Sequence, residues 1–134
     1  MKTIADSGFL IALLDRLDAH HEWAAGLIDR QPAPYLVCEA VCAEVGAVLG
    51  TPEPVIRMLE RGDLRLDFSL RDELPEVGRL LRKYRDQGMD LADACVVRMS
   101  EVHRACRVLT VDVTDFAVYR RLGNREIPRL TPET

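Results

Sequence analysis

Several acidic side chains stand where an α/β protein can bring carboxylates together. Asp6 and Asp112 each end or follow a short apolar stretch typical of a β-strand, in KTIAD and RVLTVD. Asp90 and Asp93 open the stretch DLADACVV, and Glu44 lies in the middle of VCAEVGAVL. Ligands of open parallel sheets bind at the carboxyl ends of the strands, so these acids are candidates for one shared site.

Each aspartate also has an ordinary explanation at the start of a helix. Asp6, Asp90 and Asp112 can each be an N-cap, whose side chain accepts a hydrogen bond from a backbone N–H group. Asp93 and Asp115 each stand three residues after such a candidate, in the first turn, where acids complement the helix dipole. Considered singly, each aspartate keeps both interpretations.

Glu44 is the most informative acid, because no capping role explains a carboxylate in mid-helix. Its neighbours three and four positions away are all apolar: Ala40, Val41, Ala47 and Val48. The pattern predicts that Glu44 points with the core-facing stripe, where an uncompensated carboxylate is costly. Either an arginine partner or a bound cation would stabilise it there.

One hypothesis accounts for Asp6, Glu44, Asp93 and Asp112 together. Clustered carboxylates repel one another unless cations lie between them. Oxygen ligands without His or Cys suit Mg²⁺ or Mn²⁺. Two such ions about 4 Å apart activate water and stabilise the leaving oxygen in phosphodiester cleavage. These acids therefore point to metal-dependent phosphodiester hydrolysis.

The elements that must position these acids alternate along the chain. Apolar stretches predict strands at 2–6, 35–37, 64–68, 107–111 and 126–130. Helical patterns cover 8–16, 18–30, 38–50, 51–62, 70–87, 90–104 and 114–123. Pro128 favours an edge position for the last strand. The alternation predicts a single α/β domain over residues 1–134, with a mostly parallel central sheet covered on both faces.

Composition and charge exclude several classes of protein. The hydrophobic fraction of 48% and charged fraction of 30% are typical of a soluble globular chain, and no apolar run approaches membrane-spanning length. A net charge of −4 argues against a protein that passively coats nucleic acid. The four cysteines lack zinc-site spacing, and the first residues lack signal-peptide features. We therefore expect reduced thiols and a cytoplasmic location.

The motifs IADSGFLIALLD, VCAEVGAVLG, DLADACVV and LTVDVTDF, in this order, resemble those of the PIN-domain family. The closest likeness is to VapC-like toxin ribonucleases of type II toxin–antitoxin systems, and it extends over nearly the whole chain. The resemblance implies a three-layer α/β/α sandwich and an endoribonuclease that uses one or two Mg²⁺ or Mn²⁺ ions. By motif position it implies catalytic metal ligands at Asp6, Glu44, Asp93 and Asp112, with Asp90 and Asp115 as accessory acids.

The same resemblance implies partners and supporting residues. It implies an RNA substrate, a homodimer, and a small antitoxin whose tail lies across the early helices. Ser7 and Thr110 match polar positions that often support such sites, whereas Gly8 stands where many members have a polar residue. The acidic composition leaves no obvious RNA track, and a solvated helix face is the ordinary interpretation of the basic residues. The candidates for such a track form two groups: Arg79, Arg82, Lys83 and Arg85, and Arg120, Arg121 and Arg125.

Two other classes of function stay open at this point. A PIN-like module can recognise RNA or a protein without cutting, although a complete set of four acids argues against it. A receiver-type phosphoacceptor domain also gathers aspartates at strand ends, but it needs a lysine beside them. The chain has only Lys2 and Lys83, neither at the carboxyl end of a predicted strand, which disfavours that class.

Overall fold

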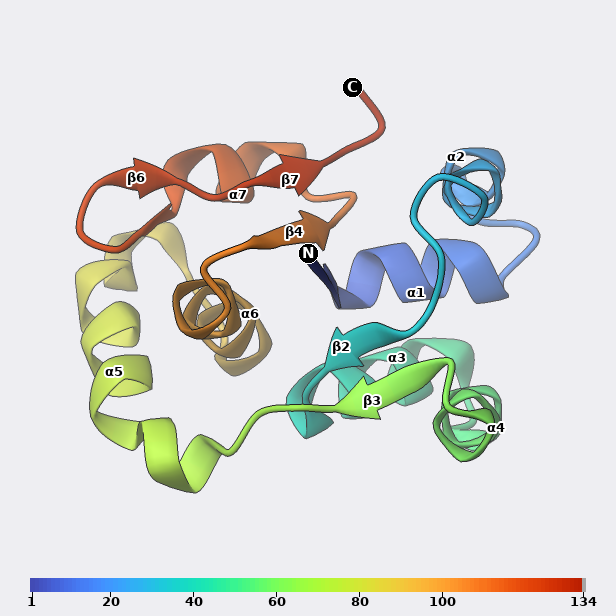
Figure 1. Cartoon of the computed structure of the whole chain (residues 1–134), viewed down its shortest axis with the longest axis horizontal. Coiled ribbons are helices and arrows are strands. Elements are labelled where there is room, and N and C mark those ends of the chain that lie inside the picture. The colour runs from blue at the N-terminus through green and yellow to red at the C-terminus, as the bar shows by residue number, and fades with distance from the viewer. Residues whose placement is uncertain (134) are drawn as a thin grey trace.

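A five-stranded sheet crosses the centre of the protein (Figure 1). The computed structural model describes residues 1–133. The strands lie in the order β3 (Leu64–Leu66), β2 (Tyr35–Val37), β1 (Lys2–Ala5), β4 (Cys106–Leu109) and β7 (Arg129–Leu130). All four pairings are parallel, and the predicted edge position of the last strand is confirmed.

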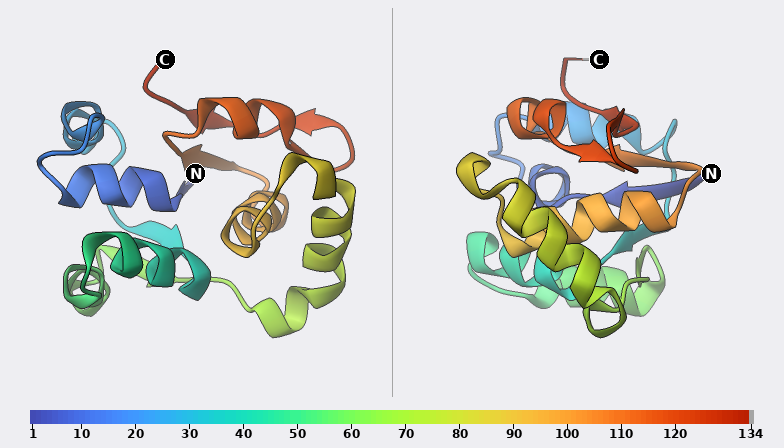
Figure 2. Two further views of the ribbon diagram at one scale, coloured as in Figure 1. Left: turned by 180° about the vertical axis from the view of Figure 1, so that it is seen from behind. Right: turned by 90° about the vertical axis from the view of Figure 1, so that its left-hand side faces the viewer.

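Helices connect these strands and pack in layers against the sheet (Figure 2). Their bounds are α1 (Ser7–Leu14), α2 (His21–Leu27), α3 (Glu39–Leu49), α4 (Glu53–Arg61), α5 (Leu70–Lys83), α6 (Leu91–Val102) and α7 (Val113–Val118). α1 packs on α2 and α3, while α6 packs on α5, α3, β1 and β4. The expected three-layer α/β/α sandwich with a mostly parallel sheet is confirmed.

Local sequence explains most of these boundaries. α3 and α4 end at Gly50 and Gly62, which both adopt the left-handed backbone conformation that glycine reaches without strain. Ser69 is the N-cap of α5, and its hydroxyl accepts a hydrogen bond from the Asp72 N–H at 3.3 Å. Pro75 lies inside α5, beyond its first turn.

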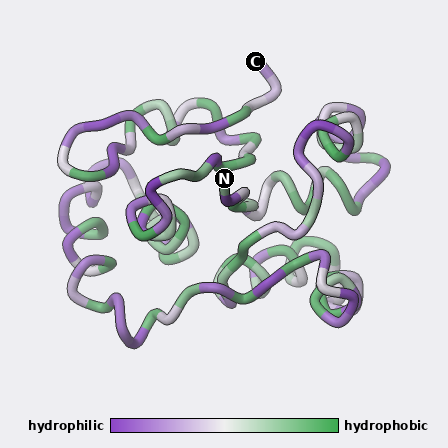
Figure 3. The backbone as a smooth tube through the Cα atoms, viewed as in Figure 1, coloured by the Kyte–Doolittle hydropathy of each residue, from purple (hydrophilic) through white to green (hydrophobic). Residues whose placement is uncertain are grey.

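The core lies between the sheet and its helices. Ile4, Val37, Val108 and Leu109 are fully buried on the strands. Figure 3 shows hydrophobic residues concentrated along α1 and α3, whereas α5 alternates between hydrophobic and hydrophilic positions. None of the helices in residues 1–133 has the length and hydropathy that crossing a membrane requires.

The end of the chain differs from the prediction. The helix expected at 114–123 stops at Val118, and the chain then forms a short antiparallel hairpin of β5 (Arg120–Arg121) and β6 (Arg125–Glu126). Leu122 and Gly123 turn the hairpin with φ angles of 50° and 90°. The sequence LGN carried this turn signal, but apolar residues before it continued the helical pattern.

Candidate active site

Two of the predicted acids meet where β1 and β4 end side by side. Ala5 pairs with Leu109 at the end of the ladder, and the Asp6 N–H donates to the Leu109 carbonyl at 3.0 Å. Asp6 therefore follows β1 beside the segment that leads from β4 to Asp112. The Asp6 carboxyl lies within electrostatic reach of Asp112, as expected for acids at the carboxyl edge of a parallel sheet.

Asp6 is the buried centre of this group, with 4% of its surface exposed. The Thr110 hydroxyl donates to Asp6 Oδ2 at 2.8 Å and accepts from the Asp112 N–H at 3.0 Å. Asp6 Oδ1 is buried and accepts no hydrogen bond from residues 1–133. Burial, reinforced by the charges of Glu44 and Asp112, raises the pKa of Asp6 to about 6. Asp6 stands at the N-cap position of α1, but its side chain makes no capping bond.

Asp93 joins the group from α6. Its N–H donates to Asp90 Oδ1 at 2.8 Å, so Asp90 is the N-cap of α6 and the Asp93 carboxylate is left free of capping. The Tyr119 hydroxyl donates to Asp93 Oδ2 at 3.0 Å. Burial, with repulsion from Asp90 and Asp6, raises the pKa of Asp93 to about 7.

Asp112 has the capping role that its position allowed, and other acids surround it. It is the N-cap of α7, and its Oδ1 accepts from the Asp115 N–H at 2.9 Å. Partial burial and the neighbouring charges of Asp115 and Asp90 raise the pKa of Asp112. The two predicted accessory acids, Asp90 and Asp115, thus lie within electrostatic reach of this side chain.

Glu44 of α3 lies near Asp6, but its side chain is not buried in the core as expected. The prediction that it faces the core was wrong: α3 buries Val41, Val45 and Gly46, whereas Val48 is 62% exposed. Glu44 lies half-buried at the edge of that stripe, and the Ser7 hydroxyl, rather than an arginine, donates to its Oε1. The apolar residues around Glu44 in sequence include exposed ones, so hydropathy alone misplaced it.

The oxygen atoms of these four carboxylates are suitable ligands for a hard divalent cation, but the carboxylates are not close enough to share one. No three His, Cys, Asp or Glu side chains in the described chain are grouped closely enough to hold a metal ion. Glu44 and Asp93 each accept from a protein hydroxyl through one carboxylate oxygen, and this contact leaves the other oxygen to face an ion. The carboxylates must still move closer together to share that ion. Asp6 Oδ1 is a buried acceptor without a donor, which a cation would satisfy. The oxygen-only chemistry matches Mg²⁺ or Mn²⁺.

Tyr119 is the site residue that the sequence reasoning missed. It follows Asp112 by seven positions, and the helical pattern around it identified it only as a residue of a short apolar helix. Its ring is fully buried, and its hydroxyl points at a carboxylate carried by another helix. A tyrosine in an apolar stretch after an acidic motif is a weak signal, because most such residues serve packing alone.

Most of the basic candidates for an RNA track are engaged within the protein. Arg79 pairs with Glu76 and Glu101, and Lys83 donates to the Gly123 carbonyl at 3.1 Å. Arg121 donates to the Ser100 carbonyl at 2.7 Å. Arg120 likewise donates to the Ala117 carbonyl, whereas Arg82, Arg85 and Arg125 are exposed.

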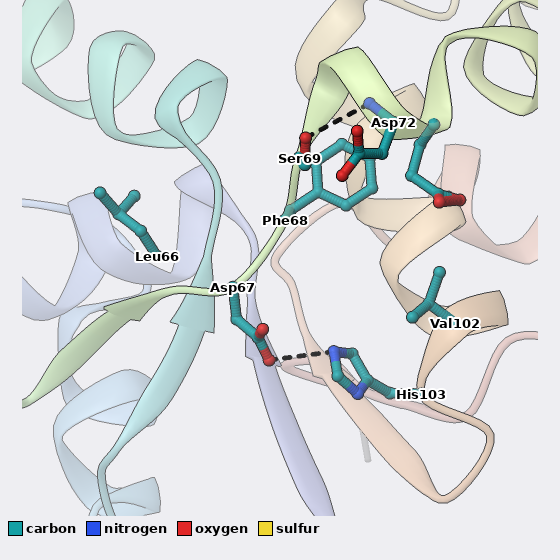
Figure 4. A pocket seen from close by; sticks show the side chains of 8 residues that line it. Leu66, Asp67, Phe68, Ser69, Asp72, Val102 and His103 are labelled. Atoms are coloured by element: carbon teal, nitrogen blue, oxygen red, sulfur yellow. Dashed lines mark hydrogen bonds and ion pairs between the residues drawn. The ribbon is translucent and has the colours of Figure 1, made fainter.

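A separate hollow of about 430 Å³ lies between the end of β3, the start of α5 and the end of α6 (Figure 4). His103 Nε2 lies 3.1 Å from Asp67 Oδ2 across it. Its lining contains none of Asp6, Glu44, Asp93 and Asp112. His103 is therefore engaged away from the acid group.

The sheet order, the helical layers and the acids at the ends of β1 and β4 define a PIN-like α/β/α domain. The chain is 28% identical to Ribonuclease VapC26 of Mycobacterium tuberculosis over 126 residues, which cover 90% of this chain and 93% of that protein. This relative confirms the resemblance to VapC-like PIN-domain toxin ribonucleases. No protein-family model matches the chain.

Gly8 stands where many PIN-domain proteins have a polar residue, and the structure gives a reason. Val111 occupies the space that a side chain at position 8 would fill. A Cβ added at Gly8 would overlap Val111 Cγ2. Gly8→Ala is therefore expected to lower the free energy of unfolding by about 1–3 kcal/mol, although alanine is the better helix former. Urea unfolding measures the loss of stability. Adding Val111→Ala to the Gly8→Ala variant should recover part of that loss, because it removes the overlapping methyl group. A Gly8→Ala variant as stable as the wild type would contradict this contact.

The metal-free protein is expected to gain stability from the site acids as the pH falls from about 8 to about 5. The folded-state pKa values of about 6 for Asp6 and about 7 for Asp93 lie above the ordinary value of 3.8. The stabilising contribution of such groups is complete below the ordinary pKa and is lost as the pH rises through the folded-state pKa. Urea unfolding in chelator measures this effect, and the comparison of wild type with Asp93→Asn isolates the contribution of Asp93. The stability advantage of the variant should shrink toward low pH, and a constant advantage would contradict the assignment.

Proposed function

We propose that this protein is a Mg²⁺- or Mn²⁺-dependent endoribonuclease, the toxin of a VapBC-type toxin–antitoxin pair. The observation that carries the proposal is the buried Asp6 carboxylate, which has one unsatisfied oxygen and lies among three other acids. The likeness to Ribonuclease VapC26 over 90% of the chain supports RNA as the substrate. The four cysteines are free thiols, in keeping with action in the reducing cytoplasm.

Asp6, Glu44, Asp93 and Asp112 are the residues that would hold the ion. When bound, one or two divalent ions supply a water of lowered pKa as nucleophile and stabilise the leaving oxygen. Thr110 fixes the plane of the Asp6 carboxylate by donating to Oδ2, which leaves Oδ1 as the free ligand atom. The Ser7 hydroxyl is held by Glu44 and orients that carboxylate rather than acting as a nucleophile.

The protein is also proposed to act as a homodimer that a small antitoxin silences. An apolar hollow of about 310 Å³ supports antitoxin docking near the early helices, and Leu13, Leu14, Ile28 and Met58 line it. Light scattering of the purified chain, alone and with the product of a neighbouring small reading frame, tests both parts. A monomer at all concentrations would contradict the dimer.

Cleavage of a mixed pool of structured RNAs tests the proposed activity. Protein shown to be free of antitoxin is incubated with Mg²⁺, with Mn²⁺ and with chelator, beside Asp6→Asn. We expect cleavage that requires metal and disappears in the variant. Cleavage that persists in chelator would overturn metal dependence. Failure of a folded protein both to bind Mn²⁺ and to cut would favour the alternative, a PIN-like module that binds RNA or protein without catalysis.

A further inference from the structure

Tyr119 connects the far end of α7 to the acid group. Its hydroxyl donates to Asp93 Oδ2 at 3.0 Å, and its side chain is fully buried. Asp112 is the N-cap of α7, and Tyr119 occupies the C-cap position at the other end of the helix. One short helix therefore carries a site acid at one end and the hydrogen-bond donor of a second site acid at the other.

Aromatic packing holds the Tyr119 ring in place. The rings of Tyr84 and Phe116 meet it edge-on, with centroids 5.1 Å and 5.3 Å away. The Tyr84 hydroxyl accepts a hydrogen bond from the Arg120 N–H at 2.8 Å, which also anchors the backbone directly after Tyr119. Contacts of this kind favour edge-to-face geometry and leave a ring little rotational freedom. The Tyr119 hydroxyl is thus presented to Asp93 in a fixed direction.

The contact is not needed to build either helix. Asp90 caps α6 through the Asp93 backbone, so the Asp93 side chain is not required at the helix start. The Tyr119 N–H completes α7 by donating to the Asp115 carbonyl at 2.9 Å, independently of its hydroxyl. The phenol therefore acts on the Asp93 carboxylate alone, and a hydrogen bond to a charged acceptor is among the stronger ones.

We propose that Tyr119 is a positioning residue that orients the Asp93 carboxylate for metal binding. The inference rests on the proposed function, because it assigns Asp93 as a ligand. A donor fixed to one carboxylate oxygen sets the plane of the group and directs the other oxygen. Outer-shell partners of this kind typically change metal affinity by about 10- to 100-fold when they are removed.

Mn²⁺ titration followed by electron paramagnetic resonance tests this role without an activity assay. Tyr119→Phe keeps the ring and removes the donor, and we expect its Mn²⁺ affinity to fall by about 10- to 100-fold. Tyr84→Phe is the matched control, since it removes a buried hydroxyl from the adjacent ring that bonds Arg120 rather than Asp93. It should lower the unfolding midpoint and leave the affinity unchanged.

The outcomes separate this inference from the proposed function. Wild-type protein that binds no Mn²⁺ would overturn the metal site and the positioning role together. Asp93→Asn that binds like wild type would overturn Asp93 as a ligand and, with it, the positioning role. Wild-type binding that is lost in Asp93→Asn but unchanged in Tyr119→Phe would overturn only the positioning role. If Tyr119→Phe does not fold, 4-fluorophenylalanine at position 119 keeps the ring and fills the place of the hydroxyl without a donor. Unchanged affinity in that protein would overturn the role equally.

Discussion

Asp93→Asn is expected to abolish metal-dependent RNA cleavage while the protein stays folded. The substitution keeps the shape of the side chain, and the amide oxygen can still accept from Tyr119. It removes the negative charge that a divalent cation needs. The loss should exceed about 100-fold, because removing even an outer-shell partner of a metal ligand costs about 10- to 100-fold.

The same substitution should stabilise the metal-free protein. Burial and repulsion from Asp90 and Asp6 raise the pKa of Asp93 to about 7, so above that pH the folded protein carries a carboxylate charge that these surroundings destabilise. After allowance for partial exposure and screening by solvent, we expect a gain of about 1–2 kcal/mol at neutral to mildly alkaline pH. Urea unfolding in chelator measures the gain, and RNA cleavage measures the loss of activity.

Asp72→Asn is the matched control for this variant. Asp72 lies exposed in the first turn of α5, beside the hollow of Figure 4, and it carries the same charge away from the acid group. It should leave cleavage unchanged. A folded Asp93→Asn protein with undiminished metal-dependent cleavage would rule out Asp93 as a ligand.

Glu101→Ala is expected to cause a large loss of stability. The Glu101 side chain is 3% exposed and lies 3.2 Å from both Arg79 and Arg98. Its other oxygen accepts from the Leu122 N–H at 2.8 Å and so attaches the β5–β6 hairpin to α6. Truncation leaves that N–H without its acceptor and breaks both ion pairs, and breaking a buried pair typically costs 3–5 kcal/mol. Because both arginines retain water and other partners, we expect about 2–4 kcal/mol.

Glu76→Ala separates burial from simple charge pairing. Glu76 contacts the same two arginines, at 2.9 Å from Arg79 and 4.0 Å from Arg98, but its side chain is 41% exposed. Its removal should cost less than about 1 kcal/mol, as exposed ion pairs do. Urea unfolding of both variants makes the comparison. Equal losses would show that burial of Glu101 adds nothing to these contacts.

The sequence by itself determined the architecture and predicted which acids lie near one another. Strands at 2–6, 35–37 and 107–111 were predicted to within one or two residues at most boundaries, because short apolar stretches between helical patterns are local signals. The parallel sheet followed from their alternation, and it placed Asp6 and Asp112 at one edge before any contact was known. The ends of α3 and α4 at Gly50 and Gly62 were also predicted correctly, because the geometry of a helix C-cap depends mainly on one residue.

Only the tertiary structure decided how the acids are held. Ser7 reaches Glu44 across 37 positions, Tyr119 reaches Asp93 across 26, and Thr110 reaches Asp6 across 104. Periodicity cannot specify such pairs, because it records which face of a helix is apolar and not which residue of another element lies opposite. For the same reason hydropathy misplaced Glu44, whose apolar neighbours in sequence include exposed residues of α3. The residue types came from local pattern, whereas their hydrogen-bond partners came from the packing of helices and strands far apart in the chain.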